Sequence, residues 1–175
     1  FGIHSLFFKD AETTESENVK RLMKMNHDIG IIIGGFNDVA LTRYGEYRSY
    51  ILNNKGFTKY SLQHGYNIFP MYTFNEETFY YTTHYFQKQR LYMAKRCLPC
   101  CLAYSSLFPP YFGIHPMIGK GATIIIGNAI KLPHIKNPSQ NDIDKYHLIF
   151  VNEIKRIFKE NVKLYGNPDK HLQLF

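Results

Sequence analysis

The apolar run at residues 29–33, Ile-Gly-Ile-Ile-Ile, is the feature that most constrains the fold. It is short, β-branched and apolar throughout, which is typical of a strand buried on both faces of a parallel sheet. Gly34 and Gly35 end the run abruptly. Two further strands are predicted at residues 66–74 and 122–127, and the second of these is expected to be buried. Pro70 is tolerated in a strand only at an edge, an end or a bulge.

Helical patterns separate these strands. Helices are predicted over residues 13–27, 54–64 and 76–96, and Gly65 is expected to end the second. The clearest helix opens at Ser139, keeps helical spacing of apolar residues, and closes at Gly166. Residues 97–121 read as irregular. This alternation predicts an α/β fold, with a largely parallel sheet flanked by helices in a single domain over 1–175.

Composition narrows the class of protein. Of 175 residues, 45% are hydrophobic, which excludes wholesale disorder. No apolar run approaches the roughly 20 residues of a transmembrane helix. A formal charge of +7 with 16% aromatic residues suits nucleic acid, an anionic membrane face or a phosphorylated cofactor. No RNA-binding sheet motif, zinc finger or helix-turn-helix spacing is found, so we expect no nucleic-acid partner.

The three cysteines are crowded into Cys97, Cys100 and Cys101. An odd, crowded set argues against a disulfide framework and for a reducing compartment. A structural zinc site needs four ligands, and neither a second cysteine pair nor a suitable histidine pair lies nearby. We therefore expect no metal site.

Three groups of motifs, taken in order, resemble the type-two diacylglycerol acyltransferase family, which also includes monoacylglycerol and wax-ester acyltransferases. The resemblance runs from about Phe1 to the C-terminus. The motifs are residues 32–38 with the Gly34-Gly35 pair; Lys55-Gly56-Phe57, Gly65, Phe69-Pro70 and Phe74-Asn75-Glu76; and Ile126-Gly127-Asn128, Leu132-Pro133, Pro138 and residues 142–147 and 163–166.

This resemblance implies an integral enzyme of the endoplasmic reticulum membrane. Such an enzyme moves a fatty acyl chain from acyl-CoA to the hydroxyl of an acylglycerol, most often from diacylglycerol to triacylglycerol. The expected partners are acyl-CoA, the acylglycerol and a membrane surface, with no cofactor besides the acyl-CoA substrate.

The family carries its catalytic histidine in a His-Pro-His-Gly motif upstream of the Gly-Gly run, and a membrane-embedded hairpin further upstream. Neither is found in this chain. We therefore expect the C-terminal part of an acyltransferase catalytic domain. A catalytically inactive fragment that binds lipid or acyl-CoA is the alternative.

Gly34, Gly35 and Asp38 stand where ligands bind in open α/β sheets, at the carboxyl end of a predicted strand. Glycines let backbone N–H groups approach an oxygen, and Asp38 could orient a donor or a substrate hydroxyl. We predict the glycines as substrate-binding and Asp38 as catalytic. A tight turn with Asp38 as an Asx cap is the alternative. The family usually has Glu at the position of Asp38.

Asn75 and Glu76 follow the next predicted strand and should lie at the same sheet edge. We predict Asn75 as substrate-binding and Glu76 as catalytic, either supporting a histidine base or binding the acceptor. The alternative is a helix N-cap followed by the first-turn acids Glu76 and Glu77. Asn75 replaces a family glycine, and Asn is the best substitute if that position needs a positive φ.

Lys55, together with Lys59 and Arg43, is predicted to meet the phosphates of CoA. The alternative for these cations is an ordinary solvated face. The basic end of the 76–96 helix, including Arg90, would face anionic lipid in a membrane enzyme. His115 lies beyond the Gly-Gly run and is not expected to be catalytic. His147, on the apolar face of the last helix, is interpreted as structural.

Overall fold

The computed structural model describes residues 16–82, 85–96, 98, 103–104 and 121–175. The chain divides into two compact units, residues 1–32 and residues 33–175. The first unit contributes helix α2 (Ser16–Lys24), which lies within the predicted 13–27 helix. The single domain expected over 1–175 remains a prediction.

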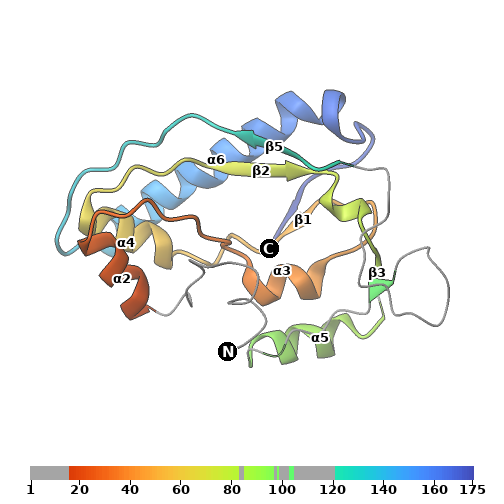
Figure 1. The fold of residues 1–175 in the computed structure, drawn as a ribbon, viewed down its shortest axis with the longest axis horizontal. Coiled ribbons are helices and arrows are strands. Elements are labelled where there is room, and N and C mark those ends of the chain that lie inside the picture. Colours follow the sequence, from red (N-terminus) through yellow and green to blue (C-terminus); the bar gives the residue numbers. More distant parts are fainter. Residues whose placement is uncertain (1–15, 83–84, 97, 99–102, 105–120) are drawn as a thin grey trace. The chain divides into compact units, whose positions relative to one another are not determined.

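The second unit is a mixed arrangement of helices and short strands (Figure 1). Its helices are α3 (Gly35–Leu41), α4 (Gly56–His64), the 3₁₀ turn η1 (Glu76–Thr78), α5 (Gln87–Ala94) and α6 (Gln140–Tyr165). Helix α4 ends at Gly65 in the left-handed conformation, as predicted. The predicted 76–96 helix is wrong in its first half, where the chain instead forms η1 and strand β3 (Tyr81–Thr82).

Helix α6 follows the sequence pattern closely. At its start, the Ser139 hydroxyl accepts the Asp142 N–H at 3.2 Å, and the Asp142 carboxylate accepts the Ser139 N–H at 3.0 Å. This reciprocal capping satisfies two donors that the first turn would leave unpaired. The apolar face of α6 is buried, and His147 on that face lies with Nε2 3.2 Å from the Leu52 carbonyl oxygen. His147 is therefore a buried structural residue, as interpreted, with its Nε2 paired to a backbone carbonyl.

The strands pair only in twos within the described residues. Strands β1 (Arg48–Ser49) and β6 (Gln173–Leu174) are parallel, whereas β2 (Met71–Phe74) pairs antiparallel with β5 (Thr123–Ile126). Strands β3 and β4 (Ala103–Tyr104) are also antiparallel. The α/β class is therefore confirmed, but a largely parallel sheet is not. Pro70 lies just before β2, at one of the positions where proline is tolerated.

The predicted strand at residues 29–33 is wrong. These residues pair with no strand in the described part of the chain, and Ile32 is 82% exposed. An apolar run cannot by itself specify a strand, since the strand also needs a neighbour to complete its hydrogen bonds.

The β2–β5 pair has one covered and one open face. Helix α6 lies behind the pair and packs against both strands (Figure 1). Tyr72, Phe74 and Ile125 join the core on that side, with Phe74 fully buried. Ile124 and Ile126 point the other way and are each 61% exposed. The 122–127 segment is therefore a strand as predicted, but only one of its faces is buried. No helix in the described residues is both long enough and apolar enough to cross a bilayer.

Candidate active site

Two glycines shape the turn that leads into α3, each for a different reason. Gly34 precedes the helix, and a Cβ there would overlap the Asp38 carboxylate. Gly35 has φ +53°, a conformation that side chains disfavour. The Gly-Gly-x-x-Asp spacing thus lets the carboxylate fold back over the turn. The turn opens a helix, although the strand expected before it is missing.

The Asp38 carboxylate is bound by a segment distant in sequence. Its Oδ1 accepts hydrogen bonds from the Tyr50 N–H and, at 3.4 Å, from the Ser49 hydroxyl. These partners belong to the β1 region, so the alternative of a local Asx cap is wrong. Burial raises the pKa of Asp38 above its usual value, and the Tyr50 and Ser49 hydrogen bonds oppose this rise.

Two arginines hold the C-terminal end of α3. The Arg48 guanidinium donates to the Leu41 carbonyl at 2.9 Å, and the Arg90 guanidinium donates to the Ala40 carbonyl. Cations at this end satisfy otherwise unpaired carbonyls and complement the helix dipole. Arg90 is only 4% exposed, so the expectation that it faces lipid is wrong. Its charge instead fixes the helix that carries Asp38.

The turn after β2 begins at Asn75, whose φ is +73°. The positive φ agrees with one of the reasons for which the family could have glycine here, and Asn is the residue best suited to replace it. The Asn75 carbonyl accepts hydrogen bonds from both the N–H and the hydroxyl of Thr78, at 3.1 and 2.8 Å. Its side chain makes no capping bond to η1 and lies 3.4 Å from the Gly121 carbonyl. Asn75 is the N-cap residue of η1, with Glu76 and Glu77 in its first turn, so the alternative is confirmed in position, although without a side-chain capping bond.

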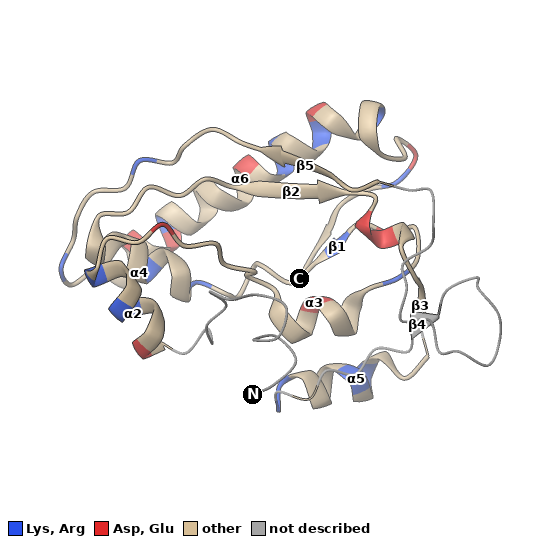
Figure 2. Cartoon of the chain, viewed as in Figure 1, with Lys and Arg blue, Asp and Glu red and all other residues tan. Residues whose placement is uncertain are grey.

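This turn carries two acids, Glu76 and Glu77, and the charge of Asp38 also acts on Glu76. Burial raises the pKa of Glu76, and the negative charges of Asp38 and Glu77 raise it further. Glu76 is accessible to solvent even though the surrounding protein removes part of its hydration, whereas Glu77 is 8% exposed. We call Asp38, Glu76 and Glu77 the carboxylate cluster. Figure 2 shows the acidic position of α3 and the acidic turn that follows β2.

Two tyrosines complete the surroundings of the cluster and were not singled out by the sequence. The Tyr47 hydroxyl accepts the Asn167 N–H at 2.7 Å and is hydrogen-bonded to the Glu77 carboxylate. Burial, and then the charges of Glu77 and Glu76, raise the pKa of Tyr72, so Tyr72 stays neutral. Tyr72 could have been placed on the core face from its alternation with Phe74. No comparable pattern marks Tyr47.

The cations that were predicted to bind phosphate interact with residues outside the carboxylate cluster. Lys55 forms an ion pair with Asp144 of α6 at 2.8 Å. The Arg43 guanidinium donates a hydrogen bond to the Gln87 side-chain oxygen at 2.5 Å and forms an ion pair with Glu46 at 3.8 Å. The roles of Lys55, Arg43 and Lys59 at CoA stay predictions. The predictions for His115 and for the cysteines Cys97, Cys100 and Cys101 fall outside the described residues.

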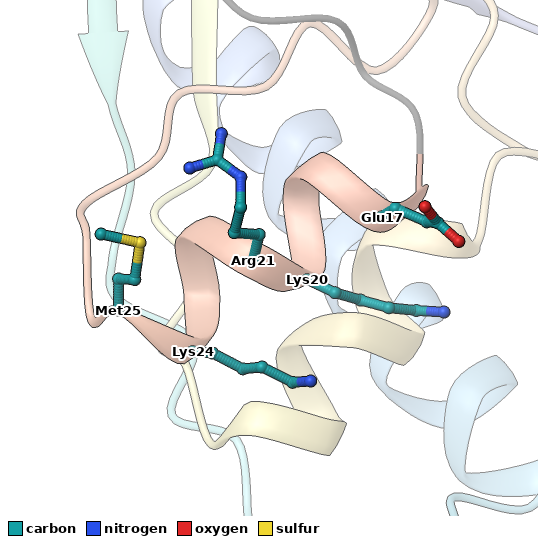
Figure 3. A pocket seen from close by; sticks show the side chains of 5 residues that line it. All are labelled: Glu17, Lys20, Arg21, Lys24 and Met25. Carbon is teal, nitrogen blue, oxygen red and sulfur yellow. The ribbon is translucent and has the colours of Figure 1, made fainter.

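A separate depression lies along helix α2 in the first unit (Figure 3). It is lined by Lys20, Arg21 and Lys24, with Glu17 and Met25. These residues follow helical spacing, so they share one face of the helix. The depression is therefore a basic helix surface and includes none of the predicted site residues.

The carboxylate cluster suits proton and hydrogen-bond chemistry at a hydroxyl. A carboxylate with a raised pKa is a stronger base and hydrogen-bond acceptor than an ordinary one. Asp38 belongs to a helix and Glu76 to a 3₁₀ turn, so the shared edge of a parallel sheet that was expected for them is not found, and their catalytic roles stay predictions. In the part of the chain that the structure covers, no three acidic, histidine or cysteine side chains gather to hold a metal ion.

Comparison with known proteins adds a family to this geometry. Residues 6–175 match the family model described as diacylglycerol acyltransferase. The chain is 27% identical to human acyl-CoA wax alcohol acyltransferase 1, over 79% of this chain and 44% of that protein. It is 29% identical to human diacylglycerol O-acyltransferase 2-like protein 6, over 79% of this chain and 44% of that protein. No solved structure gives a significant match.

A third relative is bovine diacylglycerol O-acyltransferase 2, which is 26% identical over 79% of this chain and 40% of that protein. The chain thus spans less than half the length of these curated relatives. Their names specify two different acyl acceptors, a wax alcohol and a diacylglycerol.

Proposed function

The chain belongs to the diacylglycerol acyltransferase family, and from this premise we propose that the full-length protein is an acyl-CoA-dependent O-acyltransferase. Its acceptor is an acylglycerol, with diacylglycerol the first choice and triacylglycerol the product. The similarity to diacylglycerol O-acyltransferase 2 supports this acceptor. The similarity to a wax alcohol acyltransferase makes a long-chain alcohol the acceptor to compare with it.

The observation that carries the proposal is the Asp38 carboxylate, which folds back over the Gly34-Gly35 turn and whose charge acts on Glu76. In the proposed reaction, a base removes the proton of the acceptor hydroxyl, whose oxygen attacks the thioester carbonyl carbon. A C–O bond forms, the C–S bond breaks, and the CoA thiolate takes up the proton. Asp38 orients the acceptor hydroxyl, and the ionised Glu76 orients the histidine base that the family resemblance implies.

The remaining predicted site residues are proposed to bind substrate. The backbone N–H groups at Gly34 and Gly35 and the Asn75 amide orient the acyl group and stabilise charge that develops on its oxygen. Lys55 meets a CoA phosphate, for which it must exchange its ion pair with Asp144. Location in the endoplasmic reticulum membrane belongs to the same proposal and rests on the family resemblance.

The test uses the full-length protein, expressed in a host that cannot make neutral lipid. Membranes are supplied with labelled acyl-CoA and, separately, with diacylglycerol, monoacylglycerol or a long-chain alcohol. We expect label in triacylglycerol, and loss of at least about 100-fold in Asp38→Ala and Glu76→Gln. Asp169→Asn, an exposed acid outside the cluster, serves as the matched control and should stay active.

Other outcomes are equally informative. Label in wax ester alone would keep the acyltransferase and replace the acceptor. No transfer to any acceptor, with acyl-CoA still bound in a titration of the 175-residue chain, would support the inactive lipid- or acyl-CoA-binding alternative.

A further inference from the structure

Helix α3, which carries Asp38, is too short to keep its position without outside support. It has seven residues, and a helix of that length is marginal in water unless it packs against other elements. Its last turn closes on Asp38 itself, because the Asp38 carbonyl accepts the Thr42 N–H and the Thr42 hydroxyl, each at 2.9 Å. A shift at the C-terminal end of α3 therefore moves Asp38.

Arg48 of strand β1 binds this end of α3. Its Nη1 donates to the Leu41 carbonyl at 2.9 Å, and its side chain is only 6% exposed. Its Nε donates to the Gln173 side-chain oxygen at 3.2 Å and lies 3.7 Å from the Glu46 carboxylate. The guanidinium carbon lies 4.8 Å from the centre of the Phe175 ring. A planar guanidinium can make these contacts at once, whereas a lysine ammonium is a single point charge.

Strand β1 has only two residues and is completed by strand β6, with which it pairs in parallel. The Gln173 N–H donates to the Tyr47 carbonyl at 2.8 Å, and the Phe175 N–H donates to the Ser49 carbonyl at 2.9 Å. The Phe175 carbonyl accepts the Leu52 N–H at 2.9 Å. The segment around β6 therefore fixes the backbone of β1 before, within and after the strand.

The same β1 segment supplies the donors of the Asp38 carboxylate. The Tyr50 N–H binds its Oδ1, and the Ser49 hydroxyl binds it at 3.4 Å. The segment thus holds α3 at two points, which are the Asp38 carboxylate and, through Arg48, the Leu41 carbonyl. Loss of the second point leaves the first to hold the helix against the segment.

We propose that Arg48 is a positioning residue of the acyl-transfer site, which keeps α3 on the β1 segment so that the Asp38 carboxylate stays on the Tyr50 N–H. This inference rests on the proposed function, in which Asp38 orients the acceptor hydroxyl. The buried Arg48 side chain does not touch substrate, and its effect passes through Asp38. Gln173 and Phe175 take part because they hold the guanidinium in place.

The kinetic test compares Arg48→Met, Arg48→Lys and Arg156→Met in the full-length enzyme. Arg48→Met should lower kcat per folded enzyme by about 10- to 100-fold, with little change in KM for acyl-CoA, because a displaced Asp38 misdirects the acceptor. Arg48→Lys should recover part of this loss, since one ammonium cannot replace every contact of the guanidinium. Arg156→Met is the matched control, because the ion pairs of Arg156 lie within α6, and its kcat should not change.

A second measurement does not need activity. Hydrogen exchange of the Tyr50 amide, resolved to single residues by mass spectrometry of the full-length protein, reports whether the Asp38 carboxylate stays on it. Asp38→Ala gives the exchange rate of the released amide. Arg48→Met should raise the Tyr50 rate toward that value by at least about 10-fold, while the amides of α6 keep the protection they have in the unmodified protein.

A milder variant covers the case in which Arg48→Met does not fold. Phe175→Leu keeps the backbone hydrogen bonds of the β6 segment and removes only the ring beneath the guanidinium. It should lower kcat by about two- to fivefold and raise the Tyr50 exchange rate by a similar factor. If it folds and leaves Tyr50 exchange unchanged where Arg48→Met is unfolded, the proposal is overturned.

The outcomes separate a positioning role from a general structural one. An unchanged kcat or an unchanged Tyr50 exchange rate in folded Arg48→Met would overturn the proposal. So would a loss of kcat that only follows a smaller folded fraction, or exchange that rises equally in α6. If the unmodified enzyme transfers no acyl group, the proposed function fails, and Tyr50 exchange still decides whether Arg48 holds Asp38.

Discussion

Phe74 and Glu76 are two residues apart, yet they belong to opposite kinds of surroundings. Phe74 is fully buried among the rings of Tyr47, Tyr72 and Phe158, which we call the aromatic cluster. The pKa of Glu76 is raised by burial and then by the like charges of Asp38 and Glu77. Each packing contact in the aromatic cluster stabilises the folded chain. The acidic region instead holds like charges that would move apart in an unfolded chain.

This difference shows how the fold keeps an unfavourably placed carboxylate, that of Glu76, in position. Tyr47 and Tyr72 link the two regions, because their rings pack in the aromatic cluster, while the Tyr47 hydroxyl is hydrogen-bonded to Glu77 and the charges of Glu77 and Glu76 act on Tyr72. The favourable packing of one region thus offsets the repulsion in the other. Substitutions in the two regions should therefore change stability in opposite directions.

The largest effect is expected in the aromatic cluster. Phe74→Ala should lower the free energy of unfolding by about 3–5 kcal/mol, because it empties a closed site between β2 and α6. Phe69→Ala is the matched control on the same segment, with a side chain 55% exposed, and should change stability by less than about 1 kcal/mol. Denaturant unfolding measures both. Equal losses would contradict the comparison.

Gly34→Ala should have the next largest effect. A Cβ there overlaps the Asp38 carboxylate, which must move and release its bond to the Tyr50 N–H. A buried donor left without its partner costs about 1–3 kcal/mol. Acyl transfer should fall with stability, because Asp38 is displaced from Glu76. Gly56→Ala, where a Cβ meets nothing within 4 Å, should be neutral or stabilising in the same unfolding assay.

Helix α6, which packs against the aromatic cluster, is predicted well from the sequence. The segments around the acidic region are predicted only in part. Helix α6 carries its start signal, its apolar spacing and its end signal in one continuous stretch, so local information is sufficient. The positive φ of Asn75 is also a local feature, and the sequence offered it as a condition under which Asn would replace glycine. Residues 29–33 fail because burial of a strand depends on its neighbours, and Ile32 is exposed.

The candidate site likewise has features that local sequence indicates and features that only the fold creates. The glycine spacing pointed to Asp38, and the turn after β2 pointed to Glu76, because both signals lie within a few residues. Glu77 reads from sequence as a first-turn acid like its neighbour, and only the fold brings the Tyr47 hydroxyl to it. Arg90 reads as a surface cation, and only the fold brings its guanidinium to the end of α3.

Glu76→Gln should raise stability while it abolishes activity. The pKa of Glu76 is higher in the folded chain than in the unfolded chain, so folding favours the protonated form. The stability linked to this proton is fully present in acid, below the unfolded pKa. It is lost as pH rises through the folded pKa. The variant should therefore be more stable than the unmodified chain at neutral pH and equal to it in acid.

Thermal unfolding across a pH series measures this difference. The gain should be smaller than the loss at Gly34, because Glu76 is solvent-accessible and water screens its charge. Asp169→Asn is the control and should track the unmodified chain at every pH. A gain that persists in acid would mean that glutamine makes a new contact, and the charge argument would fail.

The smallest effect is expected on the open face of the β2–β5 pair. Ile126→Thr should change stability by less than about 0.5 kcal/mol, because the side chain is 61% exposed and threonine keeps the β-branched shape that strands favour. Ile125→Thr, one residue earlier and facing α6, should cost about 1–2 kcal/mol in the same denaturant assay. The two substitutions are chemically identical and differ only in the face they alter. The same pair should also be measured in the full-length protein. If Ile126→Thr lowers the free energy of unfolding as much as Ile125→Thr there, but not in this chain, another part of the protein covers the open face. The contrast between the two faces would then hold only for the isolated chain.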